Sequence, residues 1–172
     1  MSNAPTFIFR TLFLYHLAEY QSGNAGTIHV HLQDRTFRIS DDGRGHAIDR
    51  TINGMPYLKL VYSQLEYPFD VYQDTPLQLH TLGISLINSL CSELKVMVCK
   101  QERVYCQYYE AGQLRKEETK ANEANARGTT LEGKINSELV AGEWDLQDVQ
   151  EWFAKVKSIN TSLRLILNDR EL

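Results

Sequence analysis

Apolar and polar residues alternate over residues 27–32, and the apolar positions of this run are Ile28, Val30 and Leu32. A period of two is typical of a strand that buries one of its faces. The pattern resumes around Ile39 after a short connection near Gln33, so the two runs predict a β-hairpin. His29 and His31 share the other face of the first run, but no third ligand is visible near them and no metal site is expected.

Four other segments have apolar residues at every third or fourth position, a spacing that predicts helices with one buried side. These segments are residues 8–20, 57–65, 79–91 and the stretch that begins at Leu146. Gly23 is suited to end the first helix, and Asp145 is suited to cap the last. The buried residues expected in the third helix are Leu79, Leu82, Leu86 and Leu90.

Further alternating runs predict strands at residues 95–100, 104–110, 128–135 and 163–167. Residues 66–78 contain two prolines and two aspartates, which predicts a loop. Residues 111–127 are polar and carry charges of both signs, so we expect a mobile surface loop there. The order of these elements predicts an α+β fold: a two-layer sandwich with helices on one face of a mixed, mostly antiparallel sheet.

The composition narrows the class of protein. With 172 residues, of which 42% are hydrophobic, we expect residues 1–172 to form a single domain with its own core. The net charge of −4 argues against direct binding of duplex DNA, which requires a basic face. No secretory leader or bilayer-spanning run is visible, so we expect a cytoplasmic protein without a membrane partner. The cysteines are expected to be reduced packing residues; they are Cys91, Cys99 and Cys106.

The second strand of the predicted hairpin ends in the sequence Asp41-Asp42-Gly43-Arg44-Gly45. Glycines in such a turn permit a positive φ and the close approach of another group to the backbone. A carboxylate beside the turn can accept a hydrogen bond from an exocyclic amine such as that of adenine. Taken alone, Asp-Asp-Gly is also an ordinary turn sequence.

The pattern Asp41-x-Gly43-x-Gly45 resembles the adenine-binding motif of the GHKL (Bergerat-fold) ATPases, in the version found in the ATPase domains of gyrase B and of the topoisomerase IV B chain. Two further segments are similar to motifs of that family: Leu-His-Thr-Leu-Gly-Ile-Ser-Leu-Ile-Asn-Ser-Leu over residues 79–90, and Arg-Gly-Thr-Thr-Leu over residues 127–131. The resemblance extends from about residue 9 to residue 172. It implies a Bergerat sandwich that binds ATP or ADP, without the transducer and DNA-cleavage domains of the family.

Carried over position by position, the resemblance implies these nucleotide-binding residues: Asp41, Gly43, Arg44, Gly45, His80, Gly83 and Thr129. Asp41 would accept a hydrogen bond from adenine, Thr129 would support its carboxylate, and Arg44 would flank the base. Simpler interpretations stay open for each. The acidic turn could merely retain ancestral residues, Thr129 could be an ordinary strand residue, and His80 and Gly83 could only pack at the start of a helix.

The groups that hydrolyse ATP in this family are replaced. An ungapped alignment of the first helix and first strand places Thr11 at the family's glutamate, which activates the attacking water, and Tyr15 at the asparagine that binds Mg²⁺. Threonine is too weak a base for this task, and tyrosine is a poor ligand for a hard cation. No catalytic residue is therefore expected, and a magnesium ion has no support. Glu19 matches a family residue that pairs with the arginine at Arg44.

The family's lid motif is altered as well, because Leu77, Gln78 and Thr81 stand where it has glycines. Two functions remain open. The first is a degenerate, stand-alone relative of the gyrase B domain that binds ATP or ADP with little or no hydrolysis. The alternative is a pseudo-ATPase with a vestigial pocket that binds an unknown protein partner, such as a topoisomerase or another ATPase. An active enzyme has least support, since residues 8–21 contain no Glu-x-x-x-Asn.

Overall fold

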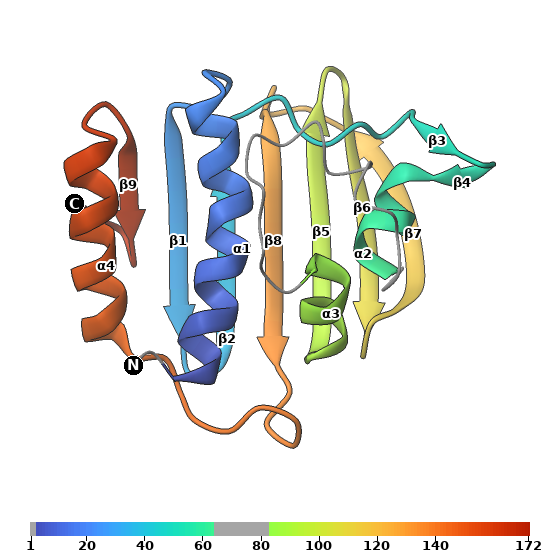
Figure 1. Ribbon diagram of the computed structural model, residues 1–172. Coiled ribbons are helices and arrows are strands. Elements are labelled where there is room, and N and C mark those ends of the chain that lie inside the picture. Colours follow the sequence, from blue (N-terminus) through green and yellow to red (C-terminus); the bar gives the residue numbers. More distant parts are fainter. Residues whose placement is uncertain (1–2, 64–82) are drawn as a thin grey trace.

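The computed structural model describes residues 3–63 and 83–172 (Figure 1). Within these residues the main sheet has eight strands in the order β10-β9-β1-β2-β8-β5-β6-β7. The strands are β1 Thr27–Gln33, β2 Thr36–Asp41, β5 Cys91–Lys100, β6 Arg103–Glu110, β7 Gln113–Ala121, β8 Gly128–Ile135, β9 Arg164–Leu167 and β10 Arg170–Glu171. Strands β1 and β9 are parallel, and the other neighbouring pairs are antiparallel.

The described helices lie on one face of this sheet (Figure 1); they are α1 Ala4–Gln21, α2 Tyr57–Ser63, α3 Ile84–Ser89 and α4 Leu146–Ile159. A small separate hairpin, β3 Thr51–Ile52 with β4 Met55–Pro56, precedes α2. The predicted α+β sandwich with a mixed, mostly antiparallel sheet is therefore confirmed. Among the described residues, none of the helices is both long and apolar enough to span a membrane.

The core between the two layers is rich in aromatic side chains. Phe9 and Phe13 of α1 meet Phe153 of α4, with ring centroids 5.8 and 4.9 Å apart. All three rings are fully buried, and each such burial stabilises the fold by about 1.5–3 kcal/mol. This packing fixes the side of α1 that faces the sheet, and thereby the direction of the residues near its C-terminal end.

Two of the predicted elements were wrong. Residues 111–127 are not a mobile loop, because β7 occupies most of the segment and pairs along its length with β6. The third predicted helix is shorter within the described residues, where α3 ends at Ser89 and Cys91 already begins β5. Its buried apolar residues are Ile84 and Ile87 rather than Leu86 and Leu90. The side of a helix that is buried depends on how the helix packs on its neighbours, and the spacing of the leucines alone did not predict it. The predicted loop at 66–78, with Leu79 and Leu82, lies outside the described residues.

Three elements converge at the upper edge of the sheet in Figure 1. Strand β2 ends there at Asp41, the antiparallel strand β8 begins there at Gly128, and the last turns of α1 lie above them. Residues that are far apart in the sequence thus come together at this edge. It contains the candidate site.

Candidate functional site

The acidic turn after β2 and the start of β8 beside it contain glycines at positions where a side chain would clash or strain the backbone. Gly45 has a φ of +72°, and Gly128 has a φ of +99°. A Cβ atom on Gly128 would lie 1.9 Å from the backbone oxygen of Asp41, and one on Gly43 would lie 2.7 Å from the Asp41 carboxylate. The turn therefore requires Gly43 and Gly45, and the start of β8 beside it requires Gly128, whether or not a ligand binds.

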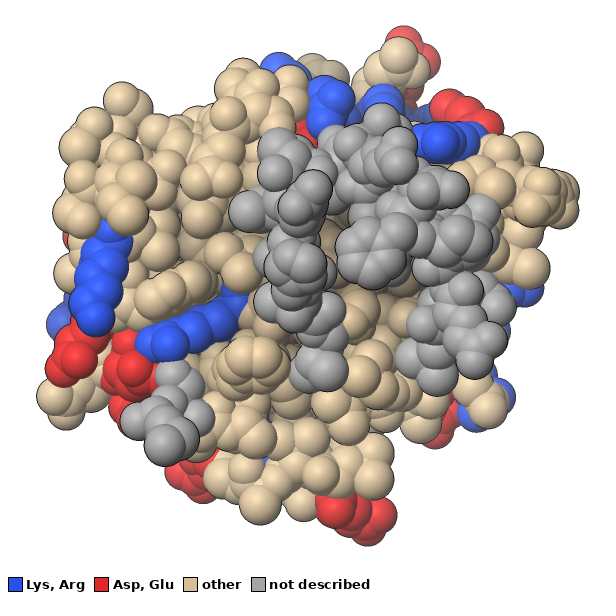
Figure 2. All heavy atoms as spheres, viewed as in Figure 1, with Lys and Arg blue, Asp and Glu red and all other residues tan. Residues whose placement is uncertain are grey.

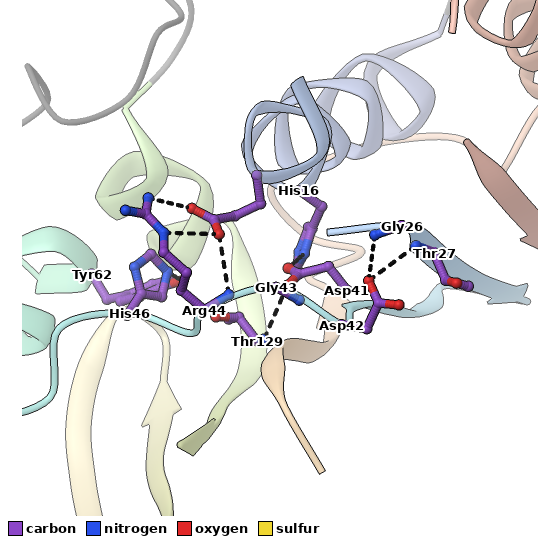
Figure 3. Close-up of polar contacts among 11 residues, drawn as sticks. His16, Gly26, Thr27, Asp41, Asp42, Gly43, Arg44, His46, Tyr62 and Thr129 are labelled. Carbon is purple, nitrogen blue, oxygen red and sulfur yellow. Dashed lines mark hydrogen bonds and ion pairs between the residues drawn. The ribbon is translucent and has the colours of Figure 1, made fainter. Parts of the chain in front are cut away.

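The carboxylate of Asp41 is buried and accepts three hydrogen bonds within the chain (Figure 3). Its Oδ1 accepts from the backbone nitrogens of Gly43, at 2.8 Å, and Thr129, at 3.4 Å. Its Oδ2 lies 2.5 Å from Nδ1 of His16. Burial alone would raise the pKa of Asp41, but His16 and the two amides outweigh it and hold the pKa below its usual value. Asp41 is therefore ionised at neutral pH.

His16 is a site residue that the sequence did not reveal. It lies on the buried side of α1, where a histidine is usually a packing residue, and 25 positions separate it from Asp41. Because Asp41 is ionised, Nδ1 of His16 carries the hydrogen of this bond. The other ring nitrogen, Nε2, is buried and has no hydrogen-bond partner in the described structure.

A second ion pair lies beside the first. Nη2 of Arg44 is 2.8 Å from Oε1 of Glu19, and the backbone nitrogen of Arg44 donates to Oε2 of Glu19 at 3.2 Å. This confirms the predicted pairing of the two side chains. The neighbouring carboxylate of Asp42 faces another way and accepts from the backbone nitrogens of Gly26 and Thr27, so it anchors the start of β1 (Figure 3).

A cavity of about 340 Å³ opens beside Asp41 and His16. Its lining combines carboxylates, phenol rings and cations; among them are Tyr15, Tyr57, Tyr62, Arg44, Arg50 and Lys100. Arg44 and Lys100 also line an adjoining hollow that reaches Arg127. Lysine and arginine side chains are seen with some acidic ones along the same upper edge of the molecule in Figure 2. A chain with a net charge of −4 thus concentrates cations at this cavity.

His46 contributes a neutral imidazole to the same lining. Its Nε2 lies 3.1 Å from the hydroxyl of Tyr62, and the two rings meet edge to face (Figure 3). Burial lowers the pKa of His46 from 6.5 to about 4. The ring is therefore uncharged near neutral pH, and it lines the cavity as a neutral group that can form hydrogen bonds.

No protein-family model matches the chain, but curated proteins do. The gyrase B protein of Borrelia hermsii is 28% identical over 143 residues, which are 80% of this chain and 22% of that protein. The gyrase B protein of Archaeoglobus fulgidus is 27% identical over 161 residues, 88% of this chain and 25% of that protein. The B chain of DNA topoisomerase 4 of Rickettsia bellii is 36% identical over 93 residues, 51% of this chain and 14% of that protein.

Two solved structures are similar along almost the whole chain. One is the 43K ATPase domain of Thermus thermophilus gyrase B in complex with an aminocoumarin, with a TM-score of 0.77 and 18% sequence identity; the match covers 96% of this chain and 43% of that chain. The other is the topoisomerase IV ATP-binding domain of Francisella tularensis in complex with a small-molecule inhibitor, with a TM-score of 0.79 and 17% sequence identity; the match covers 100% of this chain and 87% of that chain. The chain has the gyrase B ATPase-domain fold.

The resemblance that the sequence motifs predicted is thereby confirmed. This gyrase-B-like chain spans about a quarter or less of the length of the curated relatives named above. The activity of a whole gyrase or topoisomerase is therefore not carried over to it.

Thr11 and Tyr15, which the sequence alignment places at the family's glutamate and asparagine, lie in different surroundings in this structure. The hydroxyl of Thr11 is buried and donates to the backbone oxygen of Phe7 at 3.1 Å, so it stays within its own helix. Thr11 is not among the described residues that line the cavity, whereas Tyr15 is. The described residues of this cavity do not fit a magnesium ion, because the two carboxylates that line it, those of Asp41 and Glu19, are already held by His16 and Arg44.

The structure brings together most of the nucleotide-binding residues that the sequence suggested. Four of them line the cavity: Asp41, Arg44, Gly45 and Thr129. Gly43 supports the Asp41 carboxylate through its backbone nitrogen. Gly83 precedes α3 and is not among the described residues that line the cavity, and His80 lies outside the described residues. Their roles toward a nucleotide remain predictions.

Proposed function

We propose that this gyrase-B-like domain binds an adenine nucleotide, ATP or ADP, in the cavity beside Asp41 and hydrolyses it little or not at all. The observation that carries the proposal is the lining of that one cavity, which combines a buried carboxylate, tyrosine rings and cations. A purine ring, a ribose and phosphates present complementary surfaces. The cavity volume of about 340 Å³ falls in the range of about 300–1,000 Å³ that ligand pockets occupy.

The cations of the cavity differ in how freely they can meet a phosphate. Arg44 is already paired with Glu19, and the guanidinium of Arg50 lies 5.2 Å from the centre of the Tyr57 ring. Lys100 has no ion-pair partner among the described residues and lines both the cavity and the adjoining hollow. We infer that Lys100 meets an anionic group of the ligand.

The absence of hydrolysis is inferred from the first helix. A general base must reach the attacking water and have a pKa near the working pH. Thr11 meets neither requirement, because its hydroxyl is neutral, buried and bonded to Phe7. A bound nucleotide would therefore act as a structural or regulatory ligand.

Calorimetric titration with ADP and with a non-hydrolysable ATP analogue tests the proposal, together with the thermal unfolding of the same samples. A ligand that binds only the folded state at a hundredfold excess over its Kd stabilises by about 2.7 kcal/mol, which raises the melting temperature measurably. Lys100→Ala should weaken binding about tenfold, whereas Lys134→Ala, an exposed lysine of β8 away from the cavity, should not change it. Phosphate release from ATP should stay at the level of buffer alone.

The interaction-module alternative is favoured by one observation, the hold of His16 on Asp41, which occupies part of the base-binding carboxylate without any ligand. On this proposal the pocket is vestigial and the domain binds a protein partner, such as a topoisomerase or another ATPase. A folded protein that binds neither nucleotide at millimolar concentration would favour it. The supercoiling rate of a gyrase, measured with and without the chain, would then test the partner.

A further inference from the structure

We propose that His16 determines the specificity of the cavity, by deciding whether Asp41 can read the exocyclic amine of a purine. The inference rests on the proposed nucleotide binding. On that proposal the exocyclic amine of adenine would donate a hydrogen bond to the Asp41 carboxylate. In this chain the imidazole N–H of His16 already donates to that carboxylate.

The hydrogen bonds of Asp41 leave little room for a ligand. An ionised carboxylate offers about four acceptor directions, and three are used by Gly43, Thr129 and His16. The side chains of His16 and Asp41 are only 3% and 2% exposed. An amine from a purine must therefore displace the imidazole, or reach the one remaining direction of a carboxylate that is almost completely covered.

The bond between His16 and Asp41 is short and charge-assisted, with 2.5 Å between Nδ1 and Oδ2. A ligand amine that displaced it would exchange one hydrogen bond to the carboxylate for another. The net gain from the amine is then small, so the intact chain should bind a 6-aminopurine and a 6-oxopurine nucleotide almost equally. The tyrosines and cations of the cavity do not distinguish the two.

The other ring nitrogen shows that His16 is not a fully bonded core residue. Its Nε2 is buried without a partner among the described residues, so the ring is tethered on one side only, by Asp41. Buried polar groups in folded proteins are nearly always bonded, so an unbonded one calls for an explanation, and a functional role is one such explanation. An imidazole with a single tether, on a residue that lines the cavity, can be replaced without breaking a wider network.

The test compares ADP with inosine diphosphate, which carries an oxo group where ADP has the amine. Calorimetric titrations are made on the intact chain, on His16→Ala, and on His31→Ala as the matched control, since His31 is an exposed histidine of β1. The intact chain should bind both nucleotides within about twofold of each other. His16→Ala should bind ADP about tenfold to a hundredfold more tightly than the intact chain and prefer it over inosine diphosphate by a similar factor. His31→Ala should behave as the intact chain.

Two additions make the test specific. In His16→Ala, free imidazole should compete with ADP, and the additional change Asp41→Asn should remove the preference for ADP. If His16→Ala does not fold, as judged by circular dichroism, His16→Ser provides the same opened position with a small polar side chain.

Each outcome is decisive. If the intact chain binds ADP and the His16 variants bind it no better, the inference fails and the proposed function stands. If only the His16 variants bind ADP, the inference stands and nucleotide binding by the intact chain is refuted. If none of the folded proteins binds either nucleotide, both are refuted.

Discussion

The charge of His46 at a given pH is set by its position in the lining of the cavity. Its pKa falls from 6.5 to about 4 because burial disfavours the charged ring, while Asp41 and Glu19 partly oppose that effect. Between pH 6.5 and about 4 this histidine is protonated in the unfolded chain but still neutral in the folded one. Proton binding therefore favours the unfolded chain, and the stability that is fully present above pH 6.5 is lost as the pH falls toward 4.

We expect the free energy of unfolding to fall by about 2 kcal/mol from this group between pH 6.5 and 4, since one pKa unit corresponds to about 1.4 kcal/mol and the ring is only partly buried. His46→Gln keeps an amide that can bond Tyr62 but does not titrate, so its unfolding free energy should change less over this range. Urea unfolding at several pH values measures the difference. His31→Gln is the control, and an equal pH dependence in His46→Gln and the intact chain would contradict the assignment.

At the level of single residues, the sequence predicted the turn but not its partner. Asp41, Gly43 and Gly45 form a local motif, and the clash of a Cβ at Gly43 with the Asp41 carboxylate shows why the motif is strict. His16 contacts Asp41 only because α1 packs across β2. No local pattern encodes that distance, and a histidine on an apolar helix face is an ordinary packing residue.

Strand β7 was missed because it is an edge strand. Burial on one face produces the alternation that identifies a strand, and most residues of β7 are exposed on both faces. Charged side chains are a common protection for such edges, and here they made the segment resemble a loop. Strands β2 and β5, which are flanked on both sides, bury alternate residues. Strand β8 was predicted at its observed bounds, whereas β5 begins at Cys91, four residues before the predicted start.

Polar bonds fasten β7 to its neighbour. Oε1 of Glu117 accepts from the hydroxyl of Tyr105 at 2.6 Å and from the amide of Gln107 at 2.7 Å. Lys116 and Lys120 flank this point and both contact Glu118. The segment that the sequence suggested as mobile is thus held by side chains as well as by the ladder with β6.

Limited digestion with trypsin distinguishes the strand from a mobile loop. The intact chain should resist cleavage after Lys116 and Lys120, because a paired strand cannot enter the protease active site without local unfolding. Glu117→Ala removes the partner of Tyr105 and Gln107, costs about 1–2 kcal/mol, and should speed cleavage at these lysines. Glu123→Ala, in the turn after β7, is the control; rapid cutting of the intact chain at Lys116 would show that β7 does not persist in solution.

For the molecule as a whole, the arrangement of layers followed from the sequence because motif order and periodicity agree. The hairpin at residues 27–41, the strand at 128–135 and the helix capped by Asp145 each have a clear local signal, and together they specify one face for the helices. The cavity could not be predicted from the sequence, because its shape depends on side chains from α1, β2, β5 and β8 together. The chemical character of a site that forms where separate elements pack together becomes visible only in the three-dimensional structure.

The cavity offers no free carboxylate for a metal ion among the described residues, which bears on the metal dependence of nucleotide binding. Divalent magnesium assists nucleotide binding by bridging phosphate oxygens to compact oxygen ligands of the protein. The sequence alignment places Tyr15 at the family's asparagine, and the carboxylates of Asp41 and Glu19 are held by His16 and Arg44. If the proposed nucleotide binds, cations of the cavity itself are expected to neutralise its phosphates.

We therefore expect the affinity for ADP to be the same, within about twofold, in EDTA and in millimolar magnesium, as measured by calorimetric titration. Tyr15→Asn restores an amide oxygen at this position and should make binding more favourable in magnesium than in EDTA, whereas Tyr20→Asn, further along α1 and not among the described residues lining the cavity, should not. A magnesium requirement in the intact chain would mean that ligands outside the described residues complete a metal site. Phosphate neutralisation by Lys100 would then be insufficient to explain binding.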